Sequence, residues 1–151
     1  MNRTRLAVAL ALVCLLGIAL TACGEDENNA FKEDYNTAVK PLSELNEDIG
    51  SSLSGASGQS NDAISQQFEK LADKAQQARD NLAELEPPDD AKDSFDKLLS
   101  SLQKGTDDLR AVASAAKDGD PQAARQAAQD LVSSGEQIQK AETALQQDVD
   151  G

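Results

Sequence analysis

The sequence predicts an all-α protein, an antiparallel up-down-up-down four-helix bundle over residues 31–150. Four successive segments of about 25 residues carry apolar side chains alternately three and four positions apart, which places them on one helix face. Turn sequences rich in proline, glycine or serine separate these segments, and we find no sequence pattern typical of strands. Short connections between helices of similar length favour antiparallel neighbours.

The first segment begins at Phe31. Pro41 lies inside it, and the apolar spacing keeps its phase on both sides, so we expect a kink or a brief break there. Gly50 is predicted to end the helix, and the Ser/Gly-rich residues 51–58 are predicted to form a loop. The apolar face consists of Phe31, Tyr35, Ala38, Leu42, Leu45 and Ile49.

The second segment is predicted to begin near Asn61 or Asp62, residue types that cap helix N-termini. Pro87-Pro88 ends it, because proline cannot continue a helix and disfavours helical geometry in the residue before it. The next helix must therefore fold back alongside this one. The apolar face consists of Ile64, Phe68, Leu71, Ala75, Ala78, Leu82 and Leu85.

The third segment is predicted to begin with Asp89 or Asp90 as its cap. Its apolar face consists of Ala91, Phe95, Leu98, Leu102, Gly105, Leu109, Val112 and Ala116. In the turn that follows, Gly119 can end this helix, Asp120 can cap the next one, and Pro121 suits its first position. The fourth apolar face is Ala124, Ala128, Leu131, Gly135, Ile138, Ala141, Leu145 and Val149.

The middle of the predicted bundle is lined mostly by small side chains. The sequence leaves two interpretations open: the helices approach closely there, or they enclose a cavity that accepts an apolar ligand. The candidate cavity residues are Ala75, Ala78, Gly105, Leu131 and Gly135. Bulkier side chains, among them three aromatic rings, are expected to gather at one end of the bundle.

The first 22 residues have the pattern of a secretory signal. Two arginines give a positive start, and residues 6–20 form an uncharged apolar run of 15 residues. A transmembrane helix needs about 20. The run ends in Leu20-Thr21-Ala22-Cys23, which resembles the lipobox of bacterial lipoproteins. The resemblance implies cleavage between Ala22 and Cys23 and a diacylglyceryl group on the cysteine sulfur, and the alternative is an ordinary signal or a short membrane anchor.

The lipobox resemblance also implies a domain organisation. Residues 1–22 would be removed, residues 23–30 would hold the lipidated Cys23 and a short flexible tether, and residues 31–150 would form the bundle. Cys14 would leave with the signal, so no disulfide could form within one mature chain. More than one acyl chain gives stable attachment, which places the protein on the extracytoplasmic face of the cell membrane, with the membrane as its partner.

The charge and the residue types exclude several functions. The net charge of −13 becomes −15 once residues 1–22 and their two arginines are removed, which disfavours a nucleic-acid partner. The chain has no histidine, and lipidation would block the remaining cysteine, so the usual Ser-His and Cys-His mechanisms are not available. We therefore expect no enzyme, no metal site and no cofactor, and attribute the paired aspartates to capping and solvation.

A second resemblance concerns the turns. The run Leu82-Ala83-Glu84-Leu85-Glu86-Pro87-Pro88-Asp89, with Gly119-Asp120 later, resembles small helical exported lipoproteins of actinobacteria. In that group these turns join antiparallel helices, so the resemblance implies the fold and supplies no activity.

Two hypotheses of function remain. The chain is either a lipid-anchored interaction or structural module that contacts another envelope protein, or an extracytoplasmic binding protein with a small apolar or cationic ligand in the bundle core. An exposed apolar face would favour the first hypothesis, and a closed core cavity would favour the second.

Overall fold

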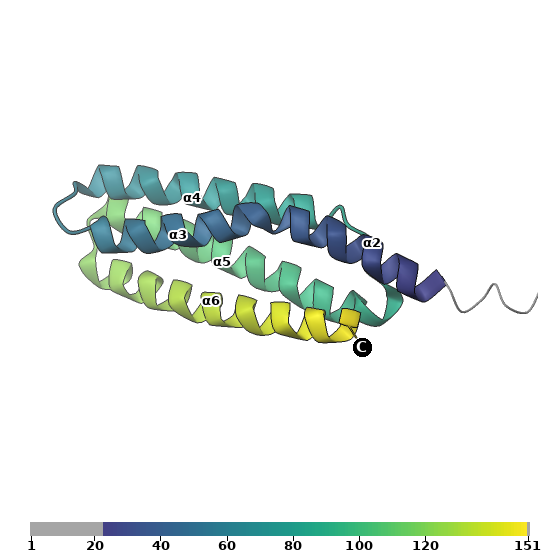
Figure 1. Cartoon of the computed structure of the whole chain (residues 1–151). Coiled ribbons are helices and arrows are strands. Elements are labelled where there is room, and N and C mark those ends of the chain that lie inside the picture. The colour runs from purple at the N-terminus through teal and green to yellow at the C-terminus, as the bar shows by residue number, and fades with distance from the viewer. Residues whose placement is uncertain (1–22, 151) are drawn as a thin grey trace, which may run out of the picture.

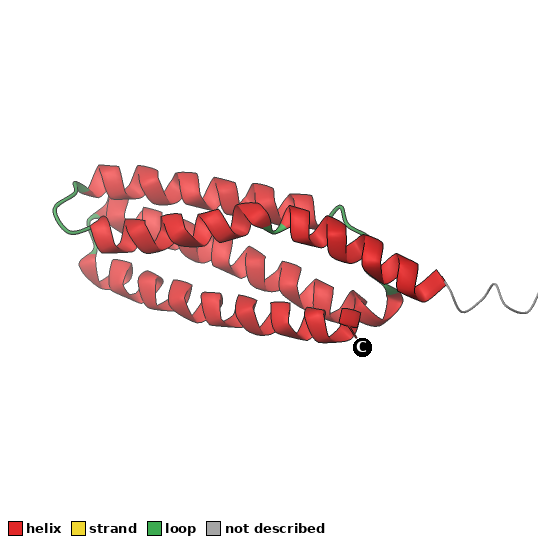
Figure 2. Cartoon of the chain, in the orientation of Figure 1, coloured by secondary structure: helices red, strands yellow, loops and turns green. Residues whose placement is uncertain are grey.

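The computed structural model describes residues 23–150, which form helices joined by short connections, with no strand in that range (Figures 1 and 2). The all-α prediction is confirmed. The helices are α2 (Cys23–Ala38), α3 (Lys40–Gly55), α4 (Asn61–Leu82), the 3-10 helix η1 (Asp89–Ala91), α5 (Lys92–Asp118) and α6 (Pro121–Asp150). The predicted signal peptide, including Ala22, lies outside the described residues.

Helices α2 and α3 follow each other end to end as one rod (Figure 1). The predicted break near Pro41 is confirmed, because Val39 separates the two helices. The Val39 N–H donates to the Tyr35 carbonyl at 2.9 Å, and the Val39 carbonyl accepts from the Leu42 N–H at 2.9 Å. Hydrogen bonding thus continues across the break, which lets both helices keep their apolar faces on the same side.

The ends of this rod differ from the prediction. Helix α2 begins at Cys23, so residues 23–30, predicted as a flexible tether, are helical. The Asn28 side chain donates to the Val149 carbonyl at 3.3 Å, which ties this part of α2 to α6. At the other end α3 runs past Gly50 to Gly55. Two of its serines hydrogen-bond back along the helix and do not initiate a loop: Ser52 donates to the Asp48 carbonyl at 2.7 Å and Ser54 donates to the Gly50 carbonyl at 2.9 Å.

Two predicted caps are wrong. Ser60, not Asn61 or Asp62, caps α4, since its hydroxyl accepts from the Ala63 N–H at 3.2 Å. Neither Asp89 nor Asp90 caps α5, because both lie in η1, which precedes it. The Asp89 carboxylate instead pairs with Lys92 at 2.5 Å, and this contact lowers the pKa of Asp89.

The turn between α5 and α6 is confirmed in each part. Gly119 ends α5 with a φ of +67°, a left-handed conformation that glycine adopts without steric cost. The Asp120 carboxylate accepts from the Gln122 and Ala123 N–H groups at 2.9 and 3.0 Å, and Pro121 is the first residue of α6. These hydrogen bonds, with that from Ala123 first, lower the pKa of Asp120 because they favour its charged form.

The core consists of two clusters of buried apolar side chains. The first cluster gathers three of the four aromatic rings, as predicted: Phe31 stacks on Tyr35 at 5.8 Å between ring centroids and meets Phe95 edge-on at 5.7 Å. Its members are Phe31, Tyr35, Leu82, Ala91, Phe95, Leu98, Leu102, Ala141, Leu145 and Val149. The second cluster is Leu45, Phe68, Leu71, Ala72, Ala75, Leu109, Val112, Ala113, Ala127 and Leu131.

The predicted apolar face of the fourth helix is wrong at two positions. Ala127 and Ser134 are buried, whereas Ala128 is half-buried and Gly135 is exposed. Helix α6 packs closely against α5. A buried hydroxyl that is hydrogen-bonded across this interface replaces the expected glycine, and periodicity of apolar residues alone cannot detect such a position.

Helix α5 packs closely against both α4 and α6, while α3 has a different environment. Helix α3 contacts α4, but within the described residues no Cα atom of α3 lies within 8 Å of a Cα atom of α5 or α6. The α3 segment is therefore held against the molecule mainly through α4 and through its own larger side chains.

Candidate functional site

The predicted lipid-attachment residue, Cys23, is the first residue of α2. Helix α2 is fixed to the end of α6 by the Asn28 hydrogen bond and by an ion pair between Lys32 and Asp150 at 2.7 Å. At 1.5 Å per residue, Cys23 precedes Phe31 by roughly 12 Å along the helix. Figure 1 shows the start of α2 and the end of α6 at the same end of the molecule.

A half-open hollow of about 200 Å³ lies between α2 and α6 at this end. Phe31, Tyr35 and Leu145 form part of its apolar lining, and the ion pair of Lys32 with Asp150 borders it. The hollow lies beside the aromatic cluster and combines rings with one pair of opposite charges. Nothing in this set resembles a nucleophile with an adjacent base.

Two titratable groups near this hollow have shifted pKa values: Tyr35, which is buried, and Glu142, which is half-buried. Burial raises the pKa of Tyr35 to about 12, and the negative charge of Glu142 adds to the effect. Burial also raises the pKa of Glu142. Both shifts favour the neutral forms, because burial disfavours the charged forms of these two groups.

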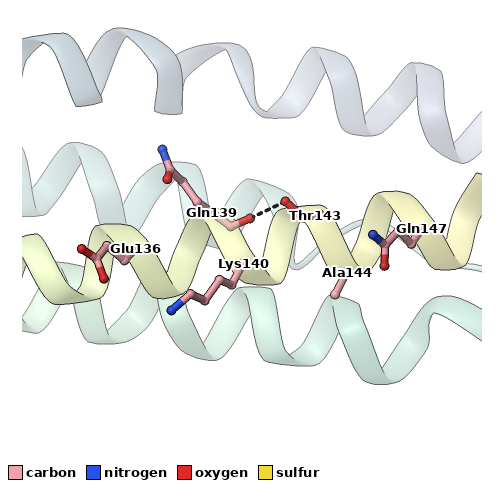
Figure 3. A pocket seen from close by; sticks show the side chains of 6 residues that line it. All are labelled: Glu136, Gln139, Lys140, Thr143, Ala144 and Gln147. Atoms are coloured by element: carbon pink, nitrogen blue, oxygen red, sulfur yellow. Dashed lines mark hydrogen bonds between the residues drawn. The ribbon is translucent and has the colours of Figure 1, made fainter.

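A second hollow, of about 430 Å³, is a shallow surface on α6 alone (Figure 3). The lining residues are Glu136, Gln139, Lys140, Thr143, Ala144 and Gln147. Gln139 and Lys140 point in opposite directions in Figure 3, and Thr143 donates back to the Gln139 carbonyl at 2.9 Å. Polar side chains that spread out from one helix do not form a binding site, so this hollow is a solvated helix face.

The predicted cavity residues do not line either hollow. Ala75, Ala78, Gly105 and Leu131 are buried, but Gly135 is exposed. A Cβ atom added at Gly105 would lie 3.3 Å from the Ile138 Cδ1 atom, so the Ile138 side chain occupies the space beside this glycine. At Gly105 the structure favours close approach of α5 and α6 over a cavity.

A polar network across α5 and α6 was not anticipated from the sequence. Ser134 is only 1 % exposed and donates to the Asp108 carboxylate, which also pairs with Lys104 at 2.8 Å. The Lys104 ammonium donates to the Ser134 hydroxyl at 3.1 Å. Serine, lysine and aspartate can form a nucleophilic centre, but this hydroxyl is closed off from any substrate. The network therefore acts as a link between two helices.

Only part of this network could have been predicted from the sequence. Lys104 and Asp108 are four residues apart, the spacing of an ion pair on one helix face. Ser134 is adjacent to Gly135, and the apolar spacing predicted that the glycine, not the serine, lies on the buried face. A buried serine has no periodic signature of its own.

Helix α3 makes a comparable but more exposed link to α4. The Gln67 side chain donates to the Ser52 hydroxyl at 2.7 Å, and Lys74 pairs with Asp48 at 2.8 Å. The Asp48 contact raises the pKa of Lys74. Both charged side chains of the ion pair are at least half exposed, so the pair contributes little to stability.

Residues 23–150 hold no group of three or more His, Cys, Asp or Glu side chains placed to bind a metal ion. None of the described helices is long and apolar enough to cross a membrane. Comparison of the chain with protein-family models, with curated proteins and with solved structures gave no match. Function has to be argued from the residues themselves.

Proposed function

We propose that this chain is a lipid-anchored, non-catalytic protein of a bacterial envelope that serves as an interaction or structural module. A lipid on Cys23 would hold it at the extracytoplasmic face of the cell membrane. The observation that carries the proposal is Leu20-Thr21-Ala22-Cys23 at the end of an uncharged apolar run. Helix α2 supports it, because a lipid on Cys23 would connect directly to a helix that packs on the body.

The finer architecture that we propose is an antiparallel up-down-up-down bundle, with the α2–α3 rod as its first helix. The short connections at 83–91 and 119–120 support reversals of the chain, and so does the close packing of α5 against both α4 and α6. In this arrangement the aromatic cluster lies at the membrane-proximal end. The connection between α3 and α4 then faces away from the membrane.

Neither feature that would separate the two hypotheses is found in the described range. Val132, at 59 % exposed, is the one large apolar side chain that is mostly exposed there, so the exposed apolar face that would favour an interaction role is absent and partner contacts would be largely polar. The mature net charge of −15 would favour a partner with a basic surface. Two observations count against the ligand-binding alternative. Gly135, a predicted cavity residue, is exposed, and Ile138 fills the space beside Gly105.

The anchor is tested by a Cys23→Ser variant expressed in cells fed a labelled fatty acid. We expect the label to be lost and the protein to accumulate as precursor or to be released from the membrane fraction. Cys14→Ser is the matched control, because it removes the other cysteine and should leave labelling intact. Label that remains on the Cys23→Ser protein would refute the anchor.

The interaction role is tested separately by mild crosslinking in the native envelope, followed by native mass spectrometry of the extracted protein. An added mass of protein size supports the module and identifies its partner. An added mass of small-molecule size, beyond the lipid anchor, would instead establish the ligand-binding alternative.

A further inference from the structure

We propose that α3 is a hinged lid, which separates from the rest of the molecule as a unit while α2, α4, α5 and α6 stay folded. Opening would uncover the second core cluster, whose large members Phe68, Leu71, Leu109 and Leu131 come from the other three long helices. The proposal concerns the folded body alone and does not depend on the lipid anchor.

The first observation is the packing of α3. Helix α5 approaches both α4 and α6 closely, and small buried residues such as Ala75, Ala113 and Ala127 on these helices allow this approach. Helix α3 has one buried apolar residue, Leu45, and stays beyond 8 Å, Cα to Cα, from both α5 and α6. Its remaining large apolar side chains, Leu42, Ile49 and Leu53, are only half-buried. Less apolar surface would be exposed by releasing α3 than by releasing α5.

The second observation is the composition of α3. Two of its 16 residues are glycine and four are serine, and Pro41 lies in its first turn. Glycine is the least favourable residue in a helix after proline, and serine is weaker than alanine. The side chains of α3 therefore provide little intrinsic helix stability, and the helix depends on its contacts with α4.

The third observation is that the helix is interrupted at both ends of α3. Val39 alone separates it from α2, and residues 56–60 connect it to α4, with Gly58 at a φ of +95°. The neighbouring helix α2 has its own attachments, through Asn28 and Lys32 to α6 and through the Phe31 ring to Phe95. Opening of α3 would leave these attachments in place.

Only two side-chain links between α3 and α4 would break on opening. They are the Gln67 to Ser52 hydrogen bond and the exposed ion pair of Lys74 with Asp48. Regions with few buried apolar contacts open at lower free energy than the whole fold, and they open as cooperative units. The lid is such a unit, and its opening presents an apolar surface that the closed form hides.

Amide hydrogen exchange of the full chain, followed by mass spectrometry of its peptides, tests the lid through two glycines. Gly50 lies in α3 and Gly135 in α6, both are exposed, and a Cβ added at either meets no atom within 4 Å. Alanine at either position should therefore strengthen its helix by a similar amount. Gly50→Ala should slow exchange of α3 amides about fivefold, the factor that corresponds to about 1 kcal/mol.

The decisive comparison is the response of α3 to Gly135→Ala. If α3 opens alone, this substitution leaves exchange in α3 unchanged while it slows exchange of the most protected α5 amides. If α3 opens only when the whole chain unfolds, Gly135→Ala and Gly50→Ala slow exchange in α3 equally. That second result, or α3 amides as well protected as those of α5, overturns the proposal.

Discussion

Tyr35 is the residue whose environment is best defined by the structure. Its ring stacks on Phe31 in the first core cluster, and its pKa rises to about 12 because burial disfavours the phenolate and Glu142 adds negative charge. A phenol with a raised pKa stabilises the fold fully below its unfolded value of 10.0, and this contribution is lost as pH rises through about 12. Alkaline conditions should therefore weaken the packing of α2 on α6.

We predict that Glu142→Gln lowers the pKa of Tyr35 but leaves it above its ordinary value, since burial is the larger cause and remains. The chain has one tyrosine and no tryptophan, so ultraviolet absorbance of the tyrosinate reports this group alone. Glu136→Gln, an exposed change on the same helix, is the control and should not shift the titration. A Tyr35 that titrates identically in the Glu142→Gln variant and in the original chain would contradict the assignment.

The same substitution has a second consequence at the residue scale. Burial raises the pKa of Glu142, so its contribution to stability is complete below its unfolded pKa and is lost as pH rises through the folded value. Glutamine stays neutral and removes this dependence. Melting temperature measured across the acidic range should therefore fall less with rising pH in the Glu142→Gln protein.

Single residues also mark the limit of what the sequence could predict. Every position that spacing selected from Ala91 to Ala116 on the third helix face is buried, because large and small apolar residues repeat there without interruption, but spacing missed the buried Ser94 and Thr106. Spacing failed at Ser134, since its burial depends on a hydrogen bond to Asp108 from another helix. A polar residue buried by a long-range partner gives no local signal.

At the scale of the helices, the turns were predictable where one conformation requires one residue type. Gly119 with its positive φ and Asp120 with its two accepted hydrogen bonds are examples. The start of α4 at Asn61 was predicted correctly, but its cap was not, because Ser60, Asn61 and Asp62 are all capping residue types and the sequence does not rank them. The length of α3 was underestimated because serine and glycine favour loops, whereas contacts with α4 hold these residues in a helix.

The close approach of α5 and α6 makes a prediction about Gly105. A leucine there would collide with Ile138, whose Cδ1 atom lies 3.3 Å from the position of a Cβ atom. We expect Gly105→Leu to lower the free energy of unfolding by about 1–3 kcal/mol, the usual cost of overpacking. Urea unfolding followed by circular dichroism measures this change.

Two further variants separate crowding from a general effect of leucine. Gly135→Leu places the same side chain in open space on α6 and should leave stability unchanged or slightly raised. The double variant Gly105→Leu with Ile138→Ala should be less destabilised than the sum of its single changes, because the shorter side chain makes room. Strict additivity would mean that Gly105 and Ile138 do not share this space.

For the whole molecule, the all-α class followed from periodicity, and the gathering of three aromatic rings followed from the predicted chain reversals. The sequence did not predict that α3 stays more than 8 Å from α5 and α6, Cα to Cα. This property depends on the distances between helices and not on the pattern within one helix. The close approach of α5 and α6 at Gly105 could not be predicted for the same reason. The sequence locates small residues on a helix face, but only the packed structure shows that Ile138 fills the space beside one of them.

The assignment of the core is tested most directly by a charge placed inside it. Leu102 lies in the first core cluster and is only 6 % exposed. An aspartate there would be a buried charge without a partner, which costs about 3–5 kcal/mol. Since small domains are stable by only about 5–15 kcal/mol, Leu102→Asp should abolish or nearly abolish the folded state.

Val132→Asp is the matched control, because Val132 is 59 % exposed on α6 and the same charge there remains in water. Helical circular dichroism and thermal melting should collapse in the Leu102 variant and stay close to the original in the Val132 variant. Equal melting temperatures for the two would mean that Leu102 is not in the core. Equal collapse of both would contradict the exposed position of Val132.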